Sequence, residues 1–300
     1  MSVEAMEFLY TEDKISEVVG VEGYEKLVRN VCQQALKSVD TTYVFLERYA
    51  YINGYAGSGV ALLSGNIGYA RNLFLDVSEG LPCDDMGMHI ASRVFSATVD
   101  EHTDRRLGHS PHRVLAKIML DAVAGYAGYD QNIEQRNRLD KKSSAFLSVV
   151  DSFKRNYQGS SHDIGALIQA LGYHIASEFL ADKEYQIIDE EVWFRHPDEQ
   201  FRHHVKRGKN REGGWYGPWS WITTHGHYGE AENDDGHGVE HEHWVDALEA
   251  ARLALKYKPE IISEKEFFVC LERGLLRFRR DWKRLFNIVL EEMDAVAKGA

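Results

Sequence analysis

Apolar residues recur at intervals of three and four along most of this chain, which is the spacing of one face of an α-helix. Residues 21–39 show it clearly, with Tyr24, Leu27, Val28, Val31 and Leu36 on one stripe. The same spacing predicts helices over residues 84–106, 112–125, 133–157, 161–181 and 234–255, one or two helices over 41–75, and two over 263–298. A further stretch, 184–193, fits either a short helix or a strand.

Local signals refine this pattern. Ser110 is placed to cap the helix that starts at His112, with Pro111 in its first turn. Small residues within 41–75 would allow close helix crossing: Gly54, Gly57, Gly59, Gly65 and Gly68. Residues 195–230 are the least regular part, and we expect an insertion or lid loop there. No repeat or clean linker appears, so we predict one all-α domain across the chain.

Composition narrows the function classes. The chain has 300 residues, 44% hydrophobic and 27% charged, which is enough to bury a core. Its net charge of −12 argues against nucleic acid as a partner, because phosphate binding needs clustered Lys and Arg. We see no signal peptide and no apolar run near the roughly 20 residues that span a bilayer. Three widely spaced cysteines fit a reducing compartment. We therefore predict a cytoplasmic protein without a membrane partner.

Three separated segments each place carboxylates near histidines. Glu101 lies close in sequence to His109 and His112, across a short turn between two predicted helices. Glu178 follows His174 by about one helical turn, at the end of an apolar stretch where a carboxylate is costly unless it is paired or bound to metal. An exposed polar turn, and a helix edge facing solvent, are the structural alternatives.

The third segment is the densest. It contains Asp234, His237, Glu240, His241 and His243. These residues occupy more than one helical face, so not all of them can bind at one place, and a histidine-rich surface helix is the alternative. Imidazole and carboxylate ligands together suit iron, manganese or zinc. Helical bundles build dinuclear sites from such ligands on several helices. The sequence therefore predicts a carboxylate/histidine metal site, most plausibly for two irons.

The order of these segments resembles the heme-oxygenase-like diiron oxidases and oxygenases, whose wider relatives include the TenA-like proteins and the chlamydial death-domain-associating protein. Three stretches carry the resemblance: Asp100-Glu101 followed by Leu107-Gly108 and Pro111-His112, Leu171-Gly172 followed by Glu178, and Glu240-x-x-His243 followed by Ala247-Leu248. The chain departs from the family where Gly236 stands in place of a histidine. An alternative register pairs Asp234 with His237 and uses His225 or His227 upstream.

The resemblance implies a heme-oxygenase-like helical bundle that binds two Fe(II) ions and activates O₂ to oxidise a small amine or amino acid. N-oxygenation, desaturation and C–C cleavage are the outcomes known for such proteins. The implied ligands are Glu101, His112 and Glu178 with two or three residues of the third segment. TenA-like hydrolysis without metal, through Cys32 or Cys83, and a non-catalytic metal-binding or ligand-binding protein are the alternatives. A homodimer is the expected assembly beyond a monomer.

Substrate recognition is expected from the irregular region and an aromatic stretch. Arg207 and Arg211 supply positive charge that suits a substrate carboxylate, and Trp221 could close over it. Tyr51 belongs to a tyrosine-rich stretch that could line the pocket. The alternatives are a structural insertion packed by its tryptophans and an aromatic core stripe.

Overall fold

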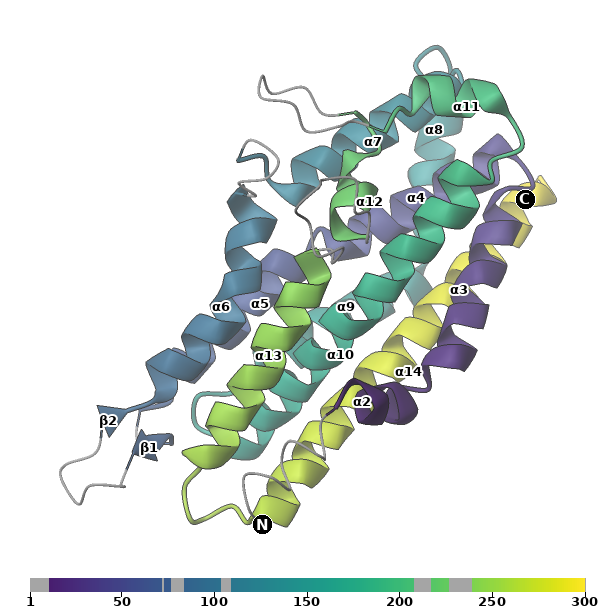
Figure 1. Cartoon of the computed structure of the whole chain (residues 1–300). Coiled ribbons are helices and arrows are strands. Elements are labelled where there is room, and N and C mark those ends of the chain that lie inside the picture. The colour runs from purple at the N-terminus through teal and green to yellow at the C-terminus, as the bar shows by residue number, and fades with distance from the viewer. Residues whose placement is uncertain are drawn as a thin grey trace.

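The computed structural model describes residues 11–71, 73–76, 84–103, 109–207, 217–226 and 239–299. These residues form an all-α bundle with one short antiparallel β pair (Figure 1), which confirms the predicted fold class. The elements are α2 (Glu12–Val19), α3 (Val21–Ala35), α4 (Val39–Asn53), α5 (Ala56–Tyr69), β1 (Leu75–Asp76), β2 (Asp84–Asp85), α6 (Gly87–Thr103), α7 (His112–Tyr126), α8 (Ile133–Asp140), α9 (Ser144–Gln158), α10 (Ile164–Ile188), η2 (Asp189–Phe194), α11 (Glu199–His204), α12 (Ser220–His225), α13 (Val239–Lys256) and α14 (Glu264–Ala297).

Helix α10 is the central element. It packs against α3, α9, α13 and α14, so it is covered on several sides and most of its residues are buried. The chain continues from α10 without a break into the π-helix η2, where separate segments were expected over 161–181 and 184–193. Together they form the one described helix that is long and apolar enough to cross a membrane. Because 72% of its apolar window is buried inside the protein, it also has the character of a core helix.

Two glycines allow α10 and α14 to cross at very short range. A Cβ atom added at Gly172 would lie 2.1 Å from the carbonyl oxygen of Leu271, and one added at Gly274 would lie 2.1 Å from that of Gln169. Backbone therefore meets backbone at this crossing, which no residue larger than glycine permits. α14 is also one continuous helix of 34 residues, where two helices were expected.

The helix predicted over 133–157 is divided into α8 and α9. The Ser143 side chain accepts a hydrogen bond from the Phe146 backbone N–H and so caps α9. The buried Arg48 guanidinium donates to the backbone carbonyls of Leu139 and Lys141, at 3.0 and 2.8 Å, which holds the break in place. A long-range contact of this kind leaves no local pattern in the sequence.

The glycine-rich stretch 41–75 contains two helices, α4 and α5, and the short strand β1. α5 packs between α6 and α9, and Gly57 faces Glu101 on α6.

The N-terminus of the helix predicted from His112 differs in one respect from the expectation. Helix α7 begins at His112 as expected, but its N-cap is Pro111 rather than Ser110, and no side chain caps it.

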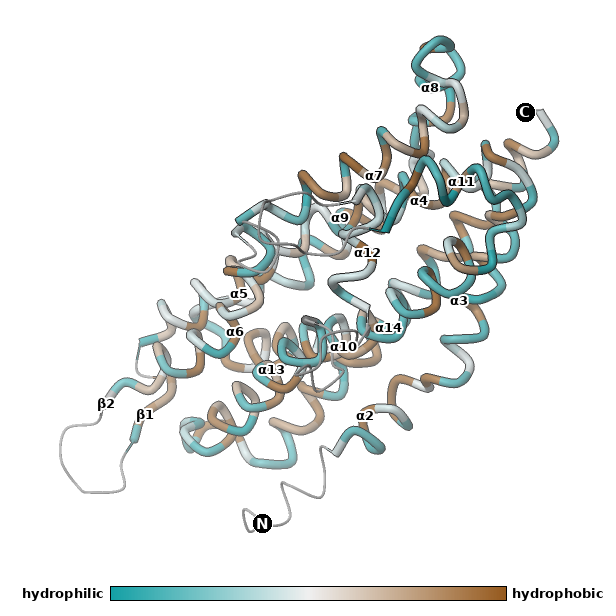
Figure 2. The backbone as a smooth tube through the Cα atoms, turned by 45° about the horizontal axis from the view of Figure 1, so that its top comes forward, coloured by the Kyte–Doolittle hydropathy of each residue, from teal (hydrophilic) through white to brown (hydrophobic). Residues whose placement is uncertain are grey.

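The region expected to be a lid, 195–230, is partly helical. Its described parts contain α11 and α12, and the side chains of Val205, Trp219 and Ile222 are buried in the common core. Residues 208–216 and 227–230 lie outside the described residues. Figure 2 shows apolar residues gathered where the helices meet, while α8 at one end of the bundle is mostly hydrophilic.

Candidate metal centre

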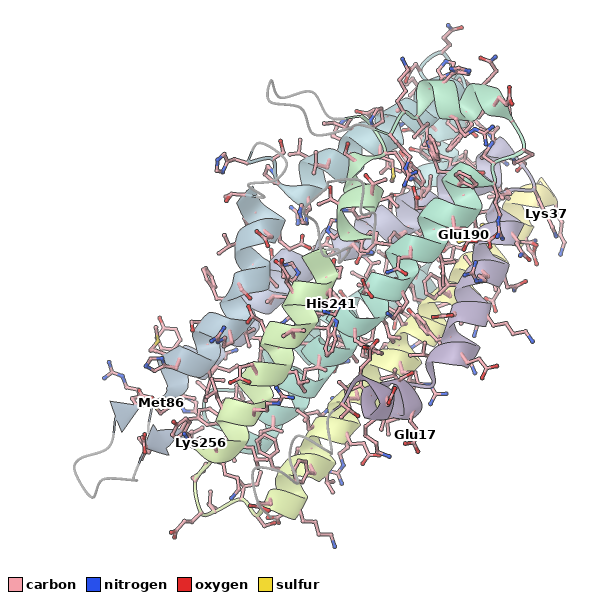
Figure 3. The ribbon with its side chains drawn as sticks, viewed as in Figure 1. Glu17, Lys37, Met86, Glu190, His241 and Lys256 are labelled. Carbon is pink, nitrogen blue, oxygen red and sulfur yellow. The ribbon has the colours of Figure 1, made fainter. Side chains whose placement is uncertain are left out.

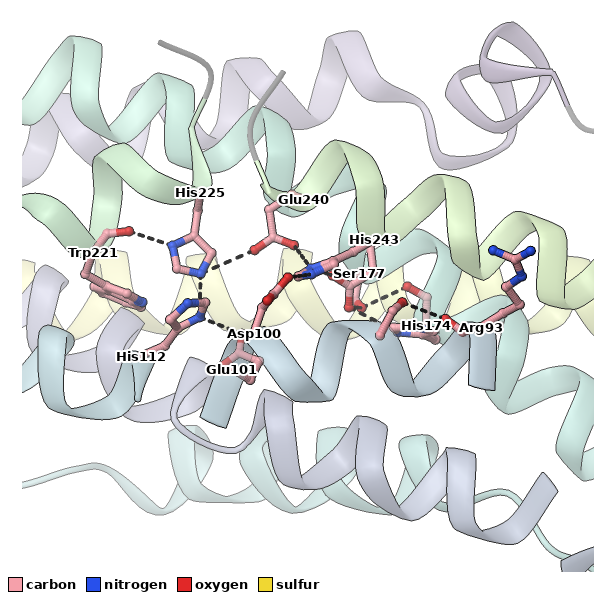
Figure 4. Close-up of polar contacts among 12 residues, drawn as sticks. Arg93, Asp100, Glu101, His112, His174, Ser177, Trp221, His225, Glu240 and His243 are labelled. Carbon is pink, nitrogen blue, oxygen red and sulfur yellow. Dashed lines mark hydrogen bonds and ion pairs between the residues drawn. The ribbon is translucent and has the colours of Figure 1, made fainter. Parts of the chain in front are cut away.

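Five helices bring two groups of acid and histidine side chains together inside the bundle (Figure 4). The first group is Glu101 from α6, His112 from α7 and His225 from α12. The second group is Glu178 from α10 with Glu240 and His243 from α13. Within each group, one donor atom per residue lies within 4.8 Å of the others. Each group joins residues from distant parts of the chain, so tertiary packing creates both groups.

The first group converges on the Nδ1 atom of His112. This atom lies 3.3 Å from Oε1 of Glu101 and 2.9 Å from Nε2 of His225. Two ligands about 2.1 Å from one ion and at right angles are separated by about 3.0 Å. The spacing in this group therefore matches ligands of a single metal ion.

The orientation of His225 is set by its backbone and aromatic neighbours. Its Nδ1 atom lies 2.5 Å from the carbonyl oxygen of Trp221, and since a carbonyl only accepts, Nδ1 carries the proton. The ring also stacks on Tyr185, with centroids 4.3 Å apart. The lone pair of Nε2 is thereby left facing His112 and Glu240, as a metal-binding histidine requires.

Glu240 connects the two groups. Its Oε1 atom lies 3.6 Å from Nε2 of His225, and its Oε2 atom lies 3.4 Å from Nδ1 of His243. The same Nδ1 lies 3.5 Å from Oε2 of Glu178, while Nε2 of His243 lies 3.1 Å from Oδ2 of Asp100. Asp100 thus holds the far side of the His243 ring, the position from which a carboxylate orients a ligating imidazole.

The buried charges of the second group alter one another's pKa values. Burial raises the pKa of Glu240 well above its usual range, and the nearby Glu178 adds to this. Burial acts in the same direction on Glu178, but contacts with His174, His243 and Glu240 outweigh it and hold the Glu178 pKa well below its usual range. Burial opposes the charge of His243, yet hydrogen bonds to Asp100, Glu178 and Glu240 raise its pKa well above normal.

One consequence is that a proton on His243 balances the buried acids in the metal-free protein. A cation that displaced this proton would meet several carboxylate oxygens in a site of low dielectric. His174 adds a further imidazole beside Glu178, with its Nδ1 3.1 Å from Oε1. His174 is fully buried, and neither of its ring nitrogens has a hydrogen-bond partner of good geometry.

The segment that carries His225 is attached to the π-helix η2. The buried carboxylate of Asp189 accepts a hydrogen bond of 2.6 Å from Nε1 of Trp219, the N-cap residue of α12. The other oxygen of Asp189 pairs with Arg207 at 2.7 Å. Asp189 therefore contacts the chain both before and after residues 208–216, at Arg207 and at Trp219. The second contact holds the start of α12.

A small cavity of about 30 Å³ adjoins both groups. Glu101, Glu178, Glu184 and Glu240 lie in its wall, and aromatic side chains supply much of the remainder. Its size suits one water or one dioxygen molecule. No Lys or Arg is among its described lining residues.

The structure brings together Glu101, His112, Glu178, Glu240 and His243 from the sequence-based ligand set. It leaves out two described members of that set. His109 is exposed and has a positive φ of 64°, and the half-buried His241 (Figure 3) accepts a hydrogen bond from the Trp244 indole N–H instead of joining either group. Asp234 and His237 lie outside the described residues.

The expected substrate-binding residues that the structure describes, Tyr51, Arg207 and Trp221, do not line the cavity. Arg207 forms an ion pair with Asp189 and lies over the Trp193 ring, so its positive charge is neutralised within the protein. Trp221 is buried in the core next to His225, and Tyr51 contacts Tyr55, Phe146 and Lys142. Arg211 lies outside the described residues. The positions of Tyr51, Arg207 and Trp221 therefore do not support a role for them in binding a substrate at this cavity.

Two residues with clear roles in the site had weak signals in the sequence. His225 entered only as an upstream alternative in a shifted register, because the segment around it resembled a loop. Its signal is local: it follows Trp221 by one helical turn in a short apolar stretch. Asp100 was noted beside Glu101 without a role, and only the packing of α6 against α13 shows its contact with His243.

Comparisons of this chain with protein-family models, with curated proteins and with solved structures find no match. The arrangement of the side chains themselves therefore carries the functional argument.

Proposed function

We propose that this protein binds two iron ions and uses them with O₂ to oxidise a small molecule. The observation that carries the proposal is the position of Glu240. Its two oxygens face two separate donor groups, each of which contains another acid and at least one histidine. A carboxylate shared between two sets of acid and histidine donors is the arrangement of a dinuclear carboxylate site in a helical bundle.

The donor set fits this metal pair. Glu101, His112 and His225 would hold one ion, and Glu178 and His243 the other, with Glu240 shared. Oxygen and imidazole donors suit iron or manganese, and His174 offers a further imidazole beside the second group. When bound, an iron pair would supply the electrons for the reduction of O₂.

The chain's own residues provide the surroundings that such chemistry needs. The cavity beside the two groups holds only a water-sized or dioxygen-sized molecule, and aromatic side chains supply much of its wall. Its ionisable lining residues are acids and tyrosines, so an amine suits the region better than the carboxylate end of an amino acid. We therefore favour oxidation of a small amine, for which part of the wall must move aside.

The structure gives less support to a metal-free hydrolase with a cysteine nucleophile. Cys32 is fully buried, and burial, with a smaller contribution from Glu191, raises its thiol pKa well above normal. A reactive cysteine needs the opposite environment, one that stabilises the thiolate. Cys83, the other residue considered, lies outside the described residues.

Anaerobic reconstitution with Fe(II), followed by metal analysis and measurement of O₂ consumption, tests the proposal. We expect two irons per chain in the parent protein and consumption of O₂ when air is admitted. Glu240→Gln should bind at most one iron, because the amide cannot bridge two ions. Glu242→Gln is the matched control, since Glu242 is exposed on the same helix.

Less than one iron per chain, with no O₂ consumption by the parent protein, would refute the proposal. Full iron binding without O₂ consumption would instead indicate a protein that binds metal without this chemistry. Equal iron content in the Glu240→Gln and Glu242→Gln variants would show that Glu240 does not bridge two ions.

A further inference from the structure

A fourth carboxyl group lies in the wall of the cavity and belongs to neither donor group. Glu184 on α10 is 1% exposed and lines the cavity together with Glu101, Glu178 and Glu240. It follows Glu178 by six residues, which corresponds to about 9 Å along an α-helix. Because Glu184 lines the cavity, it is close enough to exchange a proton with a molecule there, but it is separated from Glu178 by more than a helical turn.

The surroundings of Glu184 contain hydrogen-bond donors but no countercharge. The Tyr24 hydroxyl from α3 donates to Oε1 of Glu184. The Tyr49 hydroxyl from α4 and the Trp282 indole N–H from α14 approach the carboxyl without forming a hydrogen bond of good geometry, and both are buried. Within the described part of the chain, no Lys, Arg or His forms an ion pair with Glu184.

A buried carboxyl group without a countercharge favours its neutral, protonated form. Burial raises the Glu184 pKa to about 7, against the opposing effect of the Tyr24, Trp282 and Tyr49 donors. At neutral pH, then, Glu184 keeps a proton available beside the cavity.

We propose that Glu184 is the proton donor for the oxygen chemistry of this cavity. This inference rests on the proposed oxidase function. The Glu184 O–H bond breaks and its proton bonds to an oxygen atom of O₂ in the cavity as O₂ takes up electrons from the metal pair. One proton transferred in this way neutralises one of the electrons taken up. The Glu184 carboxylate left behind regains a proton from solvent when the product leaves.

The Glu184→Gln variant tests this role because glutamine has the same shape and can still accept the hydrogen bond from Tyr24. We expect the variant to bind as much Fe(II) as the parent protein but to consume O₂ about 100-fold more slowly, the range of general-acid effects. The dependence of the rate on pH near 7 and the solvent deuterium effect should both weaken. Glu190→Gln is the control, since Glu190 lies near the end of the same helix and pairs with Arg29 and Arg195 away from the cavity.

A second measurement does not depend on metal or O₂. Infrared difference spectra of the metal-free parent protein, recorded across pH 5 to 9, should show the C=O band of a protonated carboxyl that disappears near pH 7. The Glu184→Gln variant should lack this band. If the band is unchanged in the variant, the proton is not on Glu184 and the inference fails.

The oxygen-consumption results distinguish a failure of this inference from a failure of the proposed oxidase function. An iron-loaded parent that consumes no O₂ contradicts the oxidase function and, with it, the role of Glu184 as its proton donor. A parent that consumes O₂ and a Glu184→Gln variant that does so at the same rate contradict only the proton donor. A variant that loses iron shows that Glu184 supports the metal centre itself, which also overturns the inference.

Discussion

The substitution Gly57→Ala should weaken metal binding at the first donor group without direct contact with a metal. Gly57 lies on α5, where a Cβ atom would be 2.7 Å from Cβ of Glu101 and 3.0 Å from Cε1 of His102. The His102 ring can rotate away, but Cβ of Glu101 is attached to the backbone of α6. To restore an ordinary contact of 3.4 Å, α6 must move by roughly 0.7 Å near Glu101.

A shift of that size matters because metal–ligand distances tolerate only about 0.2 Å. Glu101 lies 3.3 Å from His112, so a displaced carboxylate would no longer reach an ion held by His112 and His225. We expect the affinity of one of the two sites to fall about 10- to 100-fold, as when a group that supports a ligand is lost. The second site, built on α10 and α13, should keep its affinity.

Anaerobic calorimetric titration with Fe(II) measures the two affinities. The matched control is Gly65→Ala on the same helix, where an added Cβ has nothing within 4 Å. That variant should gain up to about 1 kcal/mol of stability from helix propensity and bind metal as the parent does. Two unchanged affinities in Gly57→Ala would refute the reasoning, because they would show that Glu101 is no ligand or that α6 adjusts without cost.

Three further outcomes are expected. Gly172→Ala places a Cβ 2.1 Å from the backbone oxygen of Leu271, so urea unfolding should show a loss of at least about 2 kcal/mol. Asp100→Asn removes the charge that orients His243, and calorimetry should show about 10- to 100-fold weaker metal binding at the second group. Glu184 has a pKa of about 7 in the folded protein against an ordinary 4.5, so the folded state holds the extra proton and the metal-free parent loses stability as pH rises across that interval. Glu184→Gln should escape this loss, which amounts to about 3 kcal/mol, and urea unfolding at pH 5 and pH 8 checks it, with equal pH dependence of the two proteins as the contrary result.

The sequence by itself determined the helical class and most helix positions, because apolar spacing is a local property that survives folding. It also determined which residue types were available for chemistry: acids and imidazoles near one another in three segments, with no Cys-x-x-Cys. The continuous α10–η2 helix was divided in the prediction because a helix covered on several sides shows no clear polar face. The break between α8 and α9 was missed because Arg48, distant in sequence, holds it.

Only the tertiary structure decided which of the candidate residues meet. Glu101 and His112 come together because the C-terminal end of α6 meets the start of α7, while His109, equally close in sequence, faces solvent. His225 enters the site because Asp189 in η2 holds the N-cap residue of α12. The meeting of side chains depends on helix crossings such as those at Gly57 and Gly172, and a crossing distance is a relation between distant segments that no local pattern encodes.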